Sequence, residues 1–336
     1  MIHTEAFEIR SEQFEVLKSI EGFVGERIDS LLRPVSEVWQ PSDFLPDTAS
    51  KDFADQHKEL QERSNLLSDE LLVVLVGDMI TEEALPSYQT WLNRLRGLTD
   101  ETGMSDTPWA RWSRGWTAEE NRHGDLLNRY LYLTGRVDMR AVEVTTHNLI
   151  RGGFNPKTEN DPYLGFIYTS FQERATKISH RNVASLAKKE GEETLHRICG
   201  IIAGDEAGHE AAYKLFMSKI FEVDPHGAIL SFAKMMKRNI VMPGSPMHDG
   251  VDHQIFAKFA RVAQTIGVYT VNDYADIVRD LVRHWRVSSL QGLSDIAAEA
   301  QDYLCTLAER YEKLSGRDVS CNGLSFSWIH GRETAS

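Results

Sequence analysis

The spacing of apolar side chains along the chain predicts an almost entirely helical protein. Helical patterning dominates the sequence, whereas the alternation of apolar and polar residues that is typical of strands is scarce. We predict eleven helices, at residues 4–32, 50–65, 69–97, 107–134, 138–150, 163–187, 189–219, 226–238, 251–265, 271–287 and 293–313. The fold class that follows is all-α.

Local signals support several of these boundaries, and no internal segment resembles a linker between domains. Thr107 followed by Pro108 provides a capping side chain and then a proline at the first helical position, and Asp138 and Asp273 are similar polar starters. Turn signals separate the helices. We therefore expect one domain over 1–336, built as a helical bundle with peripheral helices and an irregular tail at about 315–336.

Charge and cysteine content exclude several classes of protein. The chain has 50 acidic and 37 basic residues, a net charge of −13, which disfavours non-specific nucleic-acid binding. Cys199, Cys305 and Cys321 form no Cys-x-x-Cys pair, which argues for a reducing compartment and against a zinc ribbon. The longest apolar run, 71–76, is far shorter than the roughly 18 residues that span a membrane. We expect a soluble protein without nucleic-acid or membrane partners.

Two segments share one pattern, an acid followed by Glu-x-x-His. They are Glu119-Glu120-Asn-Arg-His123 and Asp205-Glu206-Ala-Gly-His209. Residues i and i+3 lie about 60° apart around a helix, so each Glu and His pair faces the same way. A hard metal that prefers oxygen but accepts imidazole, such as iron or manganese, suits such a pair.

Single glutamates precede both motifs at similar distances. Glu82 stands 38 residues before Glu120, and Glu173 stands 33 residues before Glu206. Both follow apolar helical stretches, where a buried carboxylate requires a cation or a proton. Four glutamates and two histidines are the ligands of a ferritin-like di-iron bundle. Pro86, four residues after Glu82, predicts a kink beside that glutamate.

Simpler interpretations of these motifs exist. A third Glu-x-x-His, Glu193 to His196, stands 13 residues before Glu206 on what we predict to be the same helix. A rotation of about 220° points it away from the metal face, so we assign it to solvent. Glu120 could belong to a capping box with Thr117, although a helix start at Thr107 places it in mid-helix. Taken together, the two repeats favour the metal site.

Longer stretches resemble the soluble acyl-acyl carrier protein desaturases, the stearoyl-type enzymes of plant plastids and some bacteria. The matching segments are 73–86 (VVLVGDMITEEALP), 116–125 (WTAEENRHGD), 130–138 (YLYLTGRVD) and 162–176 (PYLGFIYTSFQERAT), and the resemblance runs from about Trp39 to Trp328. It implies a ferritin-like di-iron four-helix bundle core within a larger domain. It also implies O2-dependent insertion of a cis double bond into a saturated fatty acyl chain, of C16–C18 and at the ninth carbon, on acyl carrier protein.

The resemblance assigns roles to individual residues. Glu82 and His123 would be terminal ligands of one iron ion and Glu173 and His209 of the other, with Glu120 and Glu206 bridging both. Thr176 stands three residues after Glu173, where its hydroxyl would face the oxygen site, although such a threonine can also bond its own helix carbonyl. Asp205 would orient His123 and link it to Trp39 as an electron route. Simple packing is the alternative for Trp39.

The resemblance also implies an apolar acyl channel lined by Trp91, Leu95, Gly165 and Phe166. The family has a smaller methionine at the position of Trp91. The larger ring predicts an altered preference for chain length or double-bond position.

Acyl carrier protein and ferredoxin, the partners that the resemblance implies, are both acidic, so docking on this acidic chain requires local positive patches. Candidates are Lys188-Lys189 and Lys234 with Lys237-Arg238. The alternative interpretation is that these residues only form a solvated helix face. We expect a homodimer in the bacterial cytoplasm, or in the plastid stroma for a plant or algal chain.

Three other functions compete with desaturation. A ferritin-like ferroxidase needs only a short four-helix chain, whereas this sequence has about seven additional helices. A ribonucleotide reductase radical subunit needs a tyrosine near the irons, for which Tyr168 is a candidate. A non-catalytic acyl-carrier binding protein would not need six intact ligands.

Overall fold

The computed structural model describes residues 11–313 and 320–329, and expectations that fall on 1–10, 314–319 and 330–336 lie outside it. The described residues form thirteen α-helices and three short 3-10 helices, and their only strand-like pairing is an isolated bridge between Val137 and Ile329. The all-α fold class is therefore confirmed. The single domain over 1–336 stays a prediction, and the described part of the expected tail, 320–329, is irregular.

In chain order the α-helices are α1 (Ser11–Gly25), α2 (Ile28–Leu31), α3 (Phe53–Ser64), α4 (Asp69–Glu83), α5 (Leu85–Leu92), α6 (Pro108–Thr134), α7 (Met139–Gly152), α8 (Pro162–Glu190), α9 (Glu193–Val223), α10 (Pro225–Lys237), α11 (Ile255–Thr265), α12 (Val271–His284) and α13 (Asp295–Glu312). The 3-10 helices are η1 (Val35–Glu37), η2 (Pro41–Asp43) and η3 (Val287–Ser289).

Two of the eleven predicted helices are each divided in the structure, which accounts for the larger number. The predicted helix 69–97 forms α4 and α5, which meet at Ala84. Pro86 lies in the first turn of α5, where its missing N–H is not needed, so the expected kink is a complete break. Within the described residues, the predicted helix 4–32 likewise forms α1 and α2.

Capping side chains explain where most of the long helices begin. The side chains of Ser68, Thr107, Asp138, Asp161 and Glu192 accept backbone hydrogen bonds at the starts of α4, α6, α7, α8 and α9. α12 begins at Val271, as predicted, but Asp273 is not the residue that caps it. Thr270 caps α12, and Asp273 completes a capping box with it.

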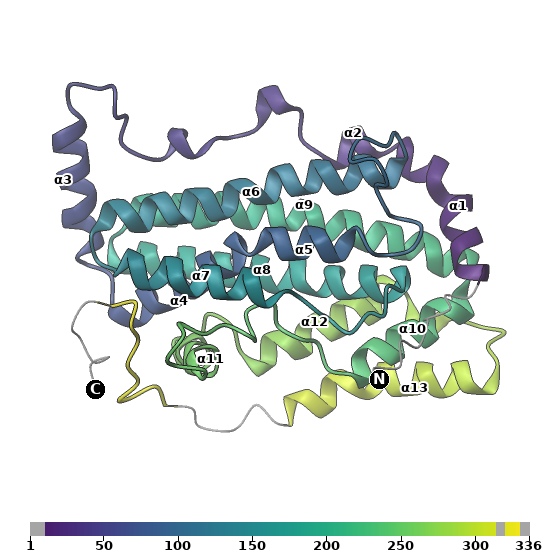
Figure 1. Ribbon diagram of the computed structural model, residues 1–336. Coiled ribbons are helices and arrows are strands. Elements are labelled where there is room, and N and C mark those ends of the chain that lie inside the picture. Colours follow the sequence, from purple (N-terminus) through teal and green to yellow (C-terminus); the bar gives the residue numbers. More distant parts are fainter. Residues whose placement is uncertain (1–10, 314–319, 330–336) are drawn as a thin grey trace, which may run out of the picture.

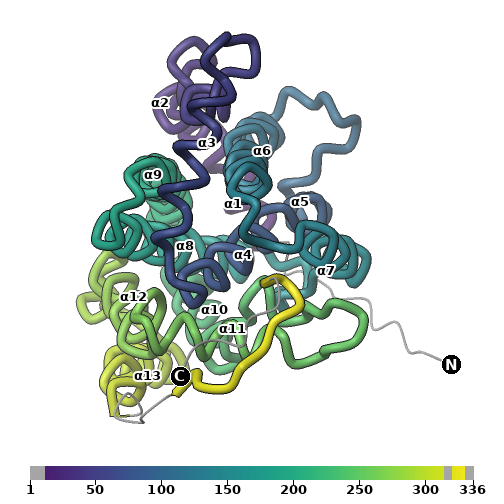
Figure 2. Tube along the Cα trace, turned by 90° about the vertical axis from the view of Figure 1, so that its left-hand side faces the viewer, coloured from purple at the N-terminus to yellow at the C-terminus, as the bar shows by residue number. Residues whose placement is uncertain are grey.

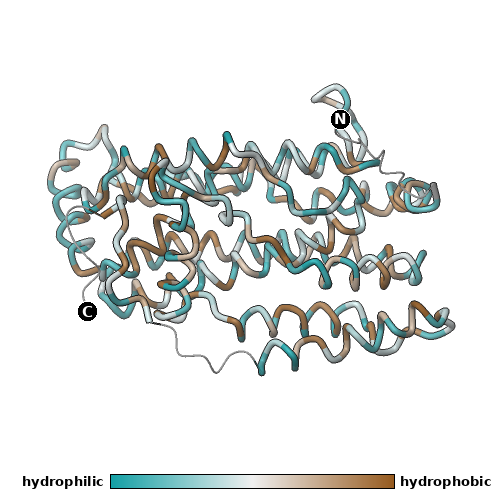
Figure 3. Tube along the Cα trace, turned by 60° about the horizontal axis from the view of Figure 1, so that its bottom comes forward, coloured by the Kyte–Doolittle hydropathy of each residue, from teal (hydrophilic) through white to brown (hydrophobic). Residues whose placement is uncertain are grey.

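Four helices, α4, α6, α8 and α9, run lengthwise through the centre of the molecule (Figure 1). Seen along their length, they surround a common interior, and α10, α11, α12 and α13 lie on one side of them (Figure 2). Apolar and polar segments are interspersed along most helices (Figure 3). In the described part of the chain, no helix combines the length and the apolar character needed to cross a membrane.

The apolar interior is divided into two clusters, with a polar layer between them. On α6 the first cluster ends at Trp116 and the second begins at Leu126. On α9 the second cluster ends at Ile202 and the first resumes at Ala212. The residues between these limits on both helices include the two Glu-x-x-His motifs. The fold thus holds the motifs in mid-bundle, shielded from water at both ends.

Candidate metal centre

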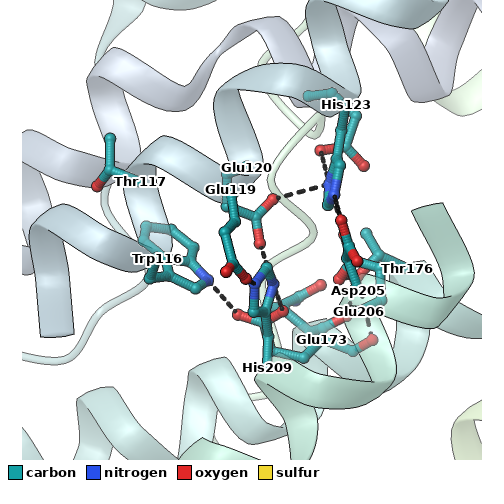
Figure 4. Close-up of polar contacts among 12 residues, drawn as sticks. Trp116, Thr117, Glu119, Glu120, His123, Glu173, Thr176, Asp205, Glu206 and His209 are labelled. Carbon is teal, nitrogen blue, oxygen red and sulfur yellow. Dashed lines mark hydrogen bonds and ion pairs between the residues drawn. The ribbon is translucent and has the colours of Figure 1, made fainter. Parts of the chain in front are cut away.

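Six side chains from the four central helices converge in the polar layer. The first group of potential ligands is Glu82, Glu120, His123 and Glu206, and the second is Glu120, Glu173, Glu206 and His209. Within each group the ligand atoms lie within 4.8 Å of one another. All six side chains are buried, and the two bridging candidates belong to both groups. The structure thus brings together every ligand that the sequence analysis selected, five of which are labelled in Figure 4.

Each histidine of the cluster contacts an acid on the opposite helix. Nε2 of His209 on α9 lies 2.9 Å from Oε2 of Glu119 on α6, and Nε2 of His123 on α6 lies 3.5 Å from Oδ2 of Asp205 on α9. The Nδ1 atoms face the cluster instead, 2.6 Å from Glu120 for His209 and 3.1 Å from Glu206 for His123. A carboxylate behind an imidazole fixes its tautomer and orients its other nitrogen toward a metal.

Four buried atoms of this cluster lack a hydrogen-bond partner among the described residues. They are Oε1 of Glu120, Nδ1 of His123, Oε1 of Glu206 and Nδ1 of His209. These atoms lie close to opposite charges, but the contacts lack hydrogen-bond geometry. A buried polar atom without a hydrogen bond costs about 1–3 kcal/mol. Four ionised carboxylates also carry a charge that two divalent cations would cancel. The cluster can therefore hold metal ions, and its oxygen and imidazole donors suit iron or manganese.

The pKa shifts within the cluster reflect the same imbalance of charge. Burial, reinforced by the negative charge of Glu120, raises the pKa of Glu173 well above its ordinary value. Burial opposes protonation of His209, but the charge of Glu120 and a hydrogen bond to Glu119 prevail and raise its pKa. Burial would also raise the pKa of Glu120, but the charges of His209 and His123 lower it. The pKa shifts of Glu173 and His209 are thus in the direction that reduces the negative charge of the cluster, as bound cations would.

Asp205 links the cluster to a tryptophan near the surface. Its Oδ2 accepts hydrogen bonds from Nε1 of Trp39 at 2.8 Å and from Nη2 of Arg122 at 3.1 Å. Trp39 is 8% exposed, and its ring is nearly parallel to that of His123, with centroids 6.1 Å apart. Burial opposes ionisation of Asp205, but His123, Arg122 and the half-exposed Arg33 together hold its pKa below the ordinary value.

The hydroxyl of Thr176 has two hydrogen-bond partners, one in the ligand cluster and one in its own helix, which correspond to the two alternatives stated for it above. Its Oγ1 lies 2.8 Å from Oε2 of Glu206 and equally 2.8 Å from the carbonyl oxygen of Gln172 in its own helix. A hydroxyl carries one proton, so it donates to one of these oxygens at a time. Thr176 also borders the large cavity described below. Its hydroxyl can therefore turn between a helix carbonyl and a ligand carboxylate.

Three further residues contact the ligands, and the sequence analysis gave none of them a role. Nε1 of Trp116 donates to Oε1 of Glu173 at 3.0 Å, and Nε2 of His180 lies 2.8 Å from Oε1 of Glu82. Glu119 holds His209 as described above. Helical spacing was the available signal: Trp116 precedes Glu120 by four residues, and His180 follows Glu173 by seven.

The third Glu-x-x-His lies outside the cluster. Glu193 is exposed, as predicted. His196 is half-buried, and its Nδ1 lies 2.9 Å from the carbonyl oxygen of Ala184, so the assignment of this histidine to solvent is wrong. The packing of α8 against α9 shields the face that the rotation argument left open to water.

A cavity of about 680 Å³ runs beside the cluster. Its wall includes Glu82, Glu120, Glu173 and Glu206, and its remaining lining is mostly apolar. Trp91 borders this cavity, where Nε1 of its indole donates to Oγ1 of Thr158 at 2.8 Å. An apolar space next to a metal-binding cluster can place an unreactive aliphatic chain beside the metal.

Of the four residues predicted to line an acyl channel, only Trp91 borders this cavity, and the role of the other three stays a prediction. Leu95, Gly165 and Phe166 are buried but do not border it. A Cβ atom on Gly165 would lie 2.4 Å from Cδ1 of Leu95, so these two residues already fill the space against each other. The ring of Trp91 packs edge-on against Phe154 and Tyr168, which also border the cavity.

The fold and the site together define a helical-bundle metalloprotein with paired Glu-x-x-His motifs and an apolar cavity. A family model described as fatty acid desaturase matches residues 12–330. The chain therefore belongs to the fatty acid desaturase family.

Curated relatives cover nearly the whole chain. The chain is 57% identical over 326 residues to stearoyl-acyl-carrier-protein 9-desaturase 2, chloroplastic, of Oryza sativa subsp. indica, an alignment that covers 96% of this chain and 82% of the relative. It is 56% identical over 327 residues to palmitoyl-acyl-carrier-protein 4-desaturase 3, chloroplastic, of Ophrys sphegodes, with the same coverage.

A solved structure supports the fold alone. The X-ray structure of DesA2 from Mycobacterium tuberculosis superposes with a TM-score of 0.53 at 18% identity, covering 85% of this chain and 99% of that one.

Proposed function

We propose that this protein is an acyl carrier protein desaturase that inserts a cis double bond into a saturated fatty acyl chain, using O2 and two iron ions. The observation on which the proposal depends is the opening of the buried six-residue cluster onto an apolar cavity. The two relatives named above, which share more than half of its residues, bear desaturase names. A ferroxidase would need the cluster but not the cavity.

The six ligands would hold the irons as two overlapping groups. Glu82 and His123 would bind one ion and Glu173 and His209 the other, with Glu120 and Glu206 bridging, as the overlap of the two groups supports. When bound, the irons would supply the O2 chemistry that removes hydrogen from an unactivated C–H bond. The acyl chain and an external donor would each give two electrons, which together reduce O2 to water.

The protein's own side chains would position the reacting groups and exclude water. Trp116 and His180 fix the outer oxygens of Glu173 and Glu82, so these ligands keep their orientation through the cycle. The hydroxyl of Thr176 would hold a proton at Oε2 of Glu206 or at its own helix carbonyl, next to the cavity. The two apolar clusters on either side of the site keep bulk water away.

Trp91 would set the position of the methyl end of the substrate. Its ring and that of Phe154 also border a second, outer cavity of about 900 Å³, so they form the wall between the acyl cavity and the outside. Because relatives named for different chain lengths and double-bond positions are almost equally similar, overall identity does not select the substrate. We propose a C16–C18 chain desaturated at the ninth carbon, with the wall at Trp91 favouring the shorter chain.

Electrons from ferredoxin would reach the irons through Trp39 and Asp205, whose hydrogen bond leads from the surface to His123. Acyl carrier protein would dock at Lys234, Lys237 and Arg238, because the loop that follows them borders the cavity.

Glu159 forms ion pairs with Lys234 and Arg238 and so partly neutralises this docking patch. Lys188 and Lys189 at the end of α8 are exposed and form the alternative docking patch.

We propose a homodimer, located in the plastid stroma or the bacterial cytoplasm according to its source.

The direct test is incubation with iron, reduced ferredoxin, O2 and acyl carrier proteins that bear saturated chains of several lengths. Mass spectrometry of the released acyl chains would locate a double bond. Iron uptake and oxidation without an unsaturated product would support a ferroxidase and overturn the proposal. Binding of acyl carrier protein without iron uptake would support a non-catalytic carrier-binding protein.

A further inference from the structure

The acyl cavity has one open end and one closed end. Its lining residues from α11, from the start of α12 and from the loop 242–244 are mostly half-exposed, so the cavity opens there. At the opposite end Leu85, Trp91 and Trp116 are buried, and Phe154, which packs against Trp91, is partly exposed toward the outer cavity. The ligand cluster borders the cavity between these ends. A chain that enters from α11 therefore passes the metal site before its tip reaches Trp91.

The open end contains a buried hydroxyl group that forms no hydrogen bond within the described protein. The phenol oxygen of Tyr269 is inaccessible to water and has no hydrogen-bond partner among the described residues, although the side chain borders the cavity. Burial raises the pKa of this phenol, so it remains a neutral donor at physiological pH. A polar atom that is buried and unpaired costs stability, and a hydrogen bond to a ligand would offset that cost.

The backbone before Tyr269 is held firmly against the bundle. Nδ2 of Asn182 on α8 donates to the carbonyl oxygen of Val268 at 3.0 Å. This contact lies three residues along α8 from Ser179, which also borders the cavity. The position of Tyr269 is therefore fixed relative to α8 and does not depend on a mobile surface segment.

A carboxylate and an amide complete the polar surface of this end. Oγ of Ser179 donates to Oδ2 of Asp78 at 2.9 Å, which leaves the other carboxylate oxygen to accept from a ligand. Gln264 on α11 also borders the cavity. Gly77 permits this arrangement, because a Cβ atom there would lie 2.3 Å from the ring of Phe259 on α11.

We propose that Tyr269, with Asp78, Ser179 and Gln264, binds the amide-bearing thioester arm (pantetheine) through which an acyl chain is joined to its carrier. This proposal rests on the proposed function. The ring of Tyr269 turns toward the occupied cavity, so that its hydroxyl donates to a carbonyl oxygen of the arm, and Asp78 accepts from an amide N–H. These contacts determine how far the acyl chain enters the cavity, and therefore which of its carbons lie beside the metal cluster. Trp91 limits only the position of the methyl end.

The test measures binding without turnover, so it can fail separately from the proposed reaction. The probes are S-dodecanoyl-pantetheine and S-methyl thiododecanoate, which share the acyl chain and the thioester but differ in the amide arm. Dissociation constants would be measured with the iron-loaded protein under argon by isothermal titration calorimetry. Tyr269→Phe should weaken binding of the pantetheine thioester about three- to tenfold, as the loss of one hydrogen bond predicts, and leave the methyl thioester unchanged.

The matched control is Tyr132→Phe, a change on α6 at a side chain that is 67% exposed and does not border the cavity. It should change neither dissociation constant. Without ligand, Tyr269→Phe should melt at the wild-type temperature or above it, because it removes an unpaired buried hydroxyl. A lower melting temperature, or equal weakening of both probes, would show a structural role and overturn the proposal. So would unchanged binding of both probes.

Discussion

The carboxylate of Glu119 on α6 lies 2.9 Å from Nε2 of His209 on α9, and the equivalent acid on α9, Asp205, contacts His123 on α6. The acid that precedes each Glu-x-x-His motif therefore serves the histidine of the other motif. The two helices hold each other's ligands in place. This crosswise pairing makes the geometry of one half of the cluster depend on the packing of the other half.

Glu119→Gln should weaken iron binding about 10- to 100-fold, because a neutral amide holds the tautomer and orientation of His209 less firmly than a carboxylate. The measurement is the iron dissociation constant by competition with a chromogenic chelator. Glu193→Gln changes an exposed carboxylate on α9 and should leave that constant unaltered. An unchanged iron affinity in Glu119→Gln would show that the contact with His209 has no effect on the metal.

Trp39→Phe should lower steady-state turnover with ferredoxin about tenfold, because it removes the hydrogen bond from Nε1 to Asp205 and keeps an apolar ring in the same space. A single turnover of enzyme that has been reduced chemically should proceed at the wild-type rate. Trp285→Phe removes an indole hydrogen bond to the carbonyl oxygen of Lys214, outside this route, and is the control. Equal loss in both assays would assign Trp39 to packing alone.

Trp91→Met should move the preferred substrate to a longer acyl chain. The smaller side chain gives up the hydrogen bond to Thr158 and lets the cavity extend. Two further buried methylene groups are worth roughly 1.6 kcal/mol, so kcat/KM for the C18 substrate relative to C16 should rise about tenfold. Product analysis over several acyl lengths provides the measurement. An unchanged product profile would mean that the cavity ends elsewhere.

Asp78 should make the protein less stable as the pH rises from about 4 to about 6. Burial raises the pKa of this carboxyl from 3.8 to about 6, so over this interval the folded state binds more protons than the unfolded state. The stability that protonation provides is present at low pH and is lost as the group ionises in the fold. The loss amounts to at most about 3 kcal/mol.

Asp78→Asn removes this titration, so its stability relative to wild type should be greater at pH 7 than at pH 4. Urea unfolding at both pH values would measure the difference for the two proteins. A constant difference between them would show that Asp78 titrates at its ordinary value in the fold.

Much of this protein follows from local sequence. The helix starts at Thr107 and Asp138 and the spacing of Glu120 with His123 depend on contacts within a few residues, and the structure agrees with all of them. The burial of Glu82 and Glu173 was likewise visible in the apolar stretches that precede them.

The tertiary structure decided which surfaces meet, and periodicity along one helix contains no such information. The relative rotation and offset of α6 and α9 place Glu119 against His209, and Leu95 packs against Gly165 outside the lining of the cavity. The same packing leaves the hydroxyl of Tyr269 buried without a partner. Helix formation is governed by neighbours in sequence, whereas the cavity and the outer partners of the ligands depend on side chains far apart in the chain.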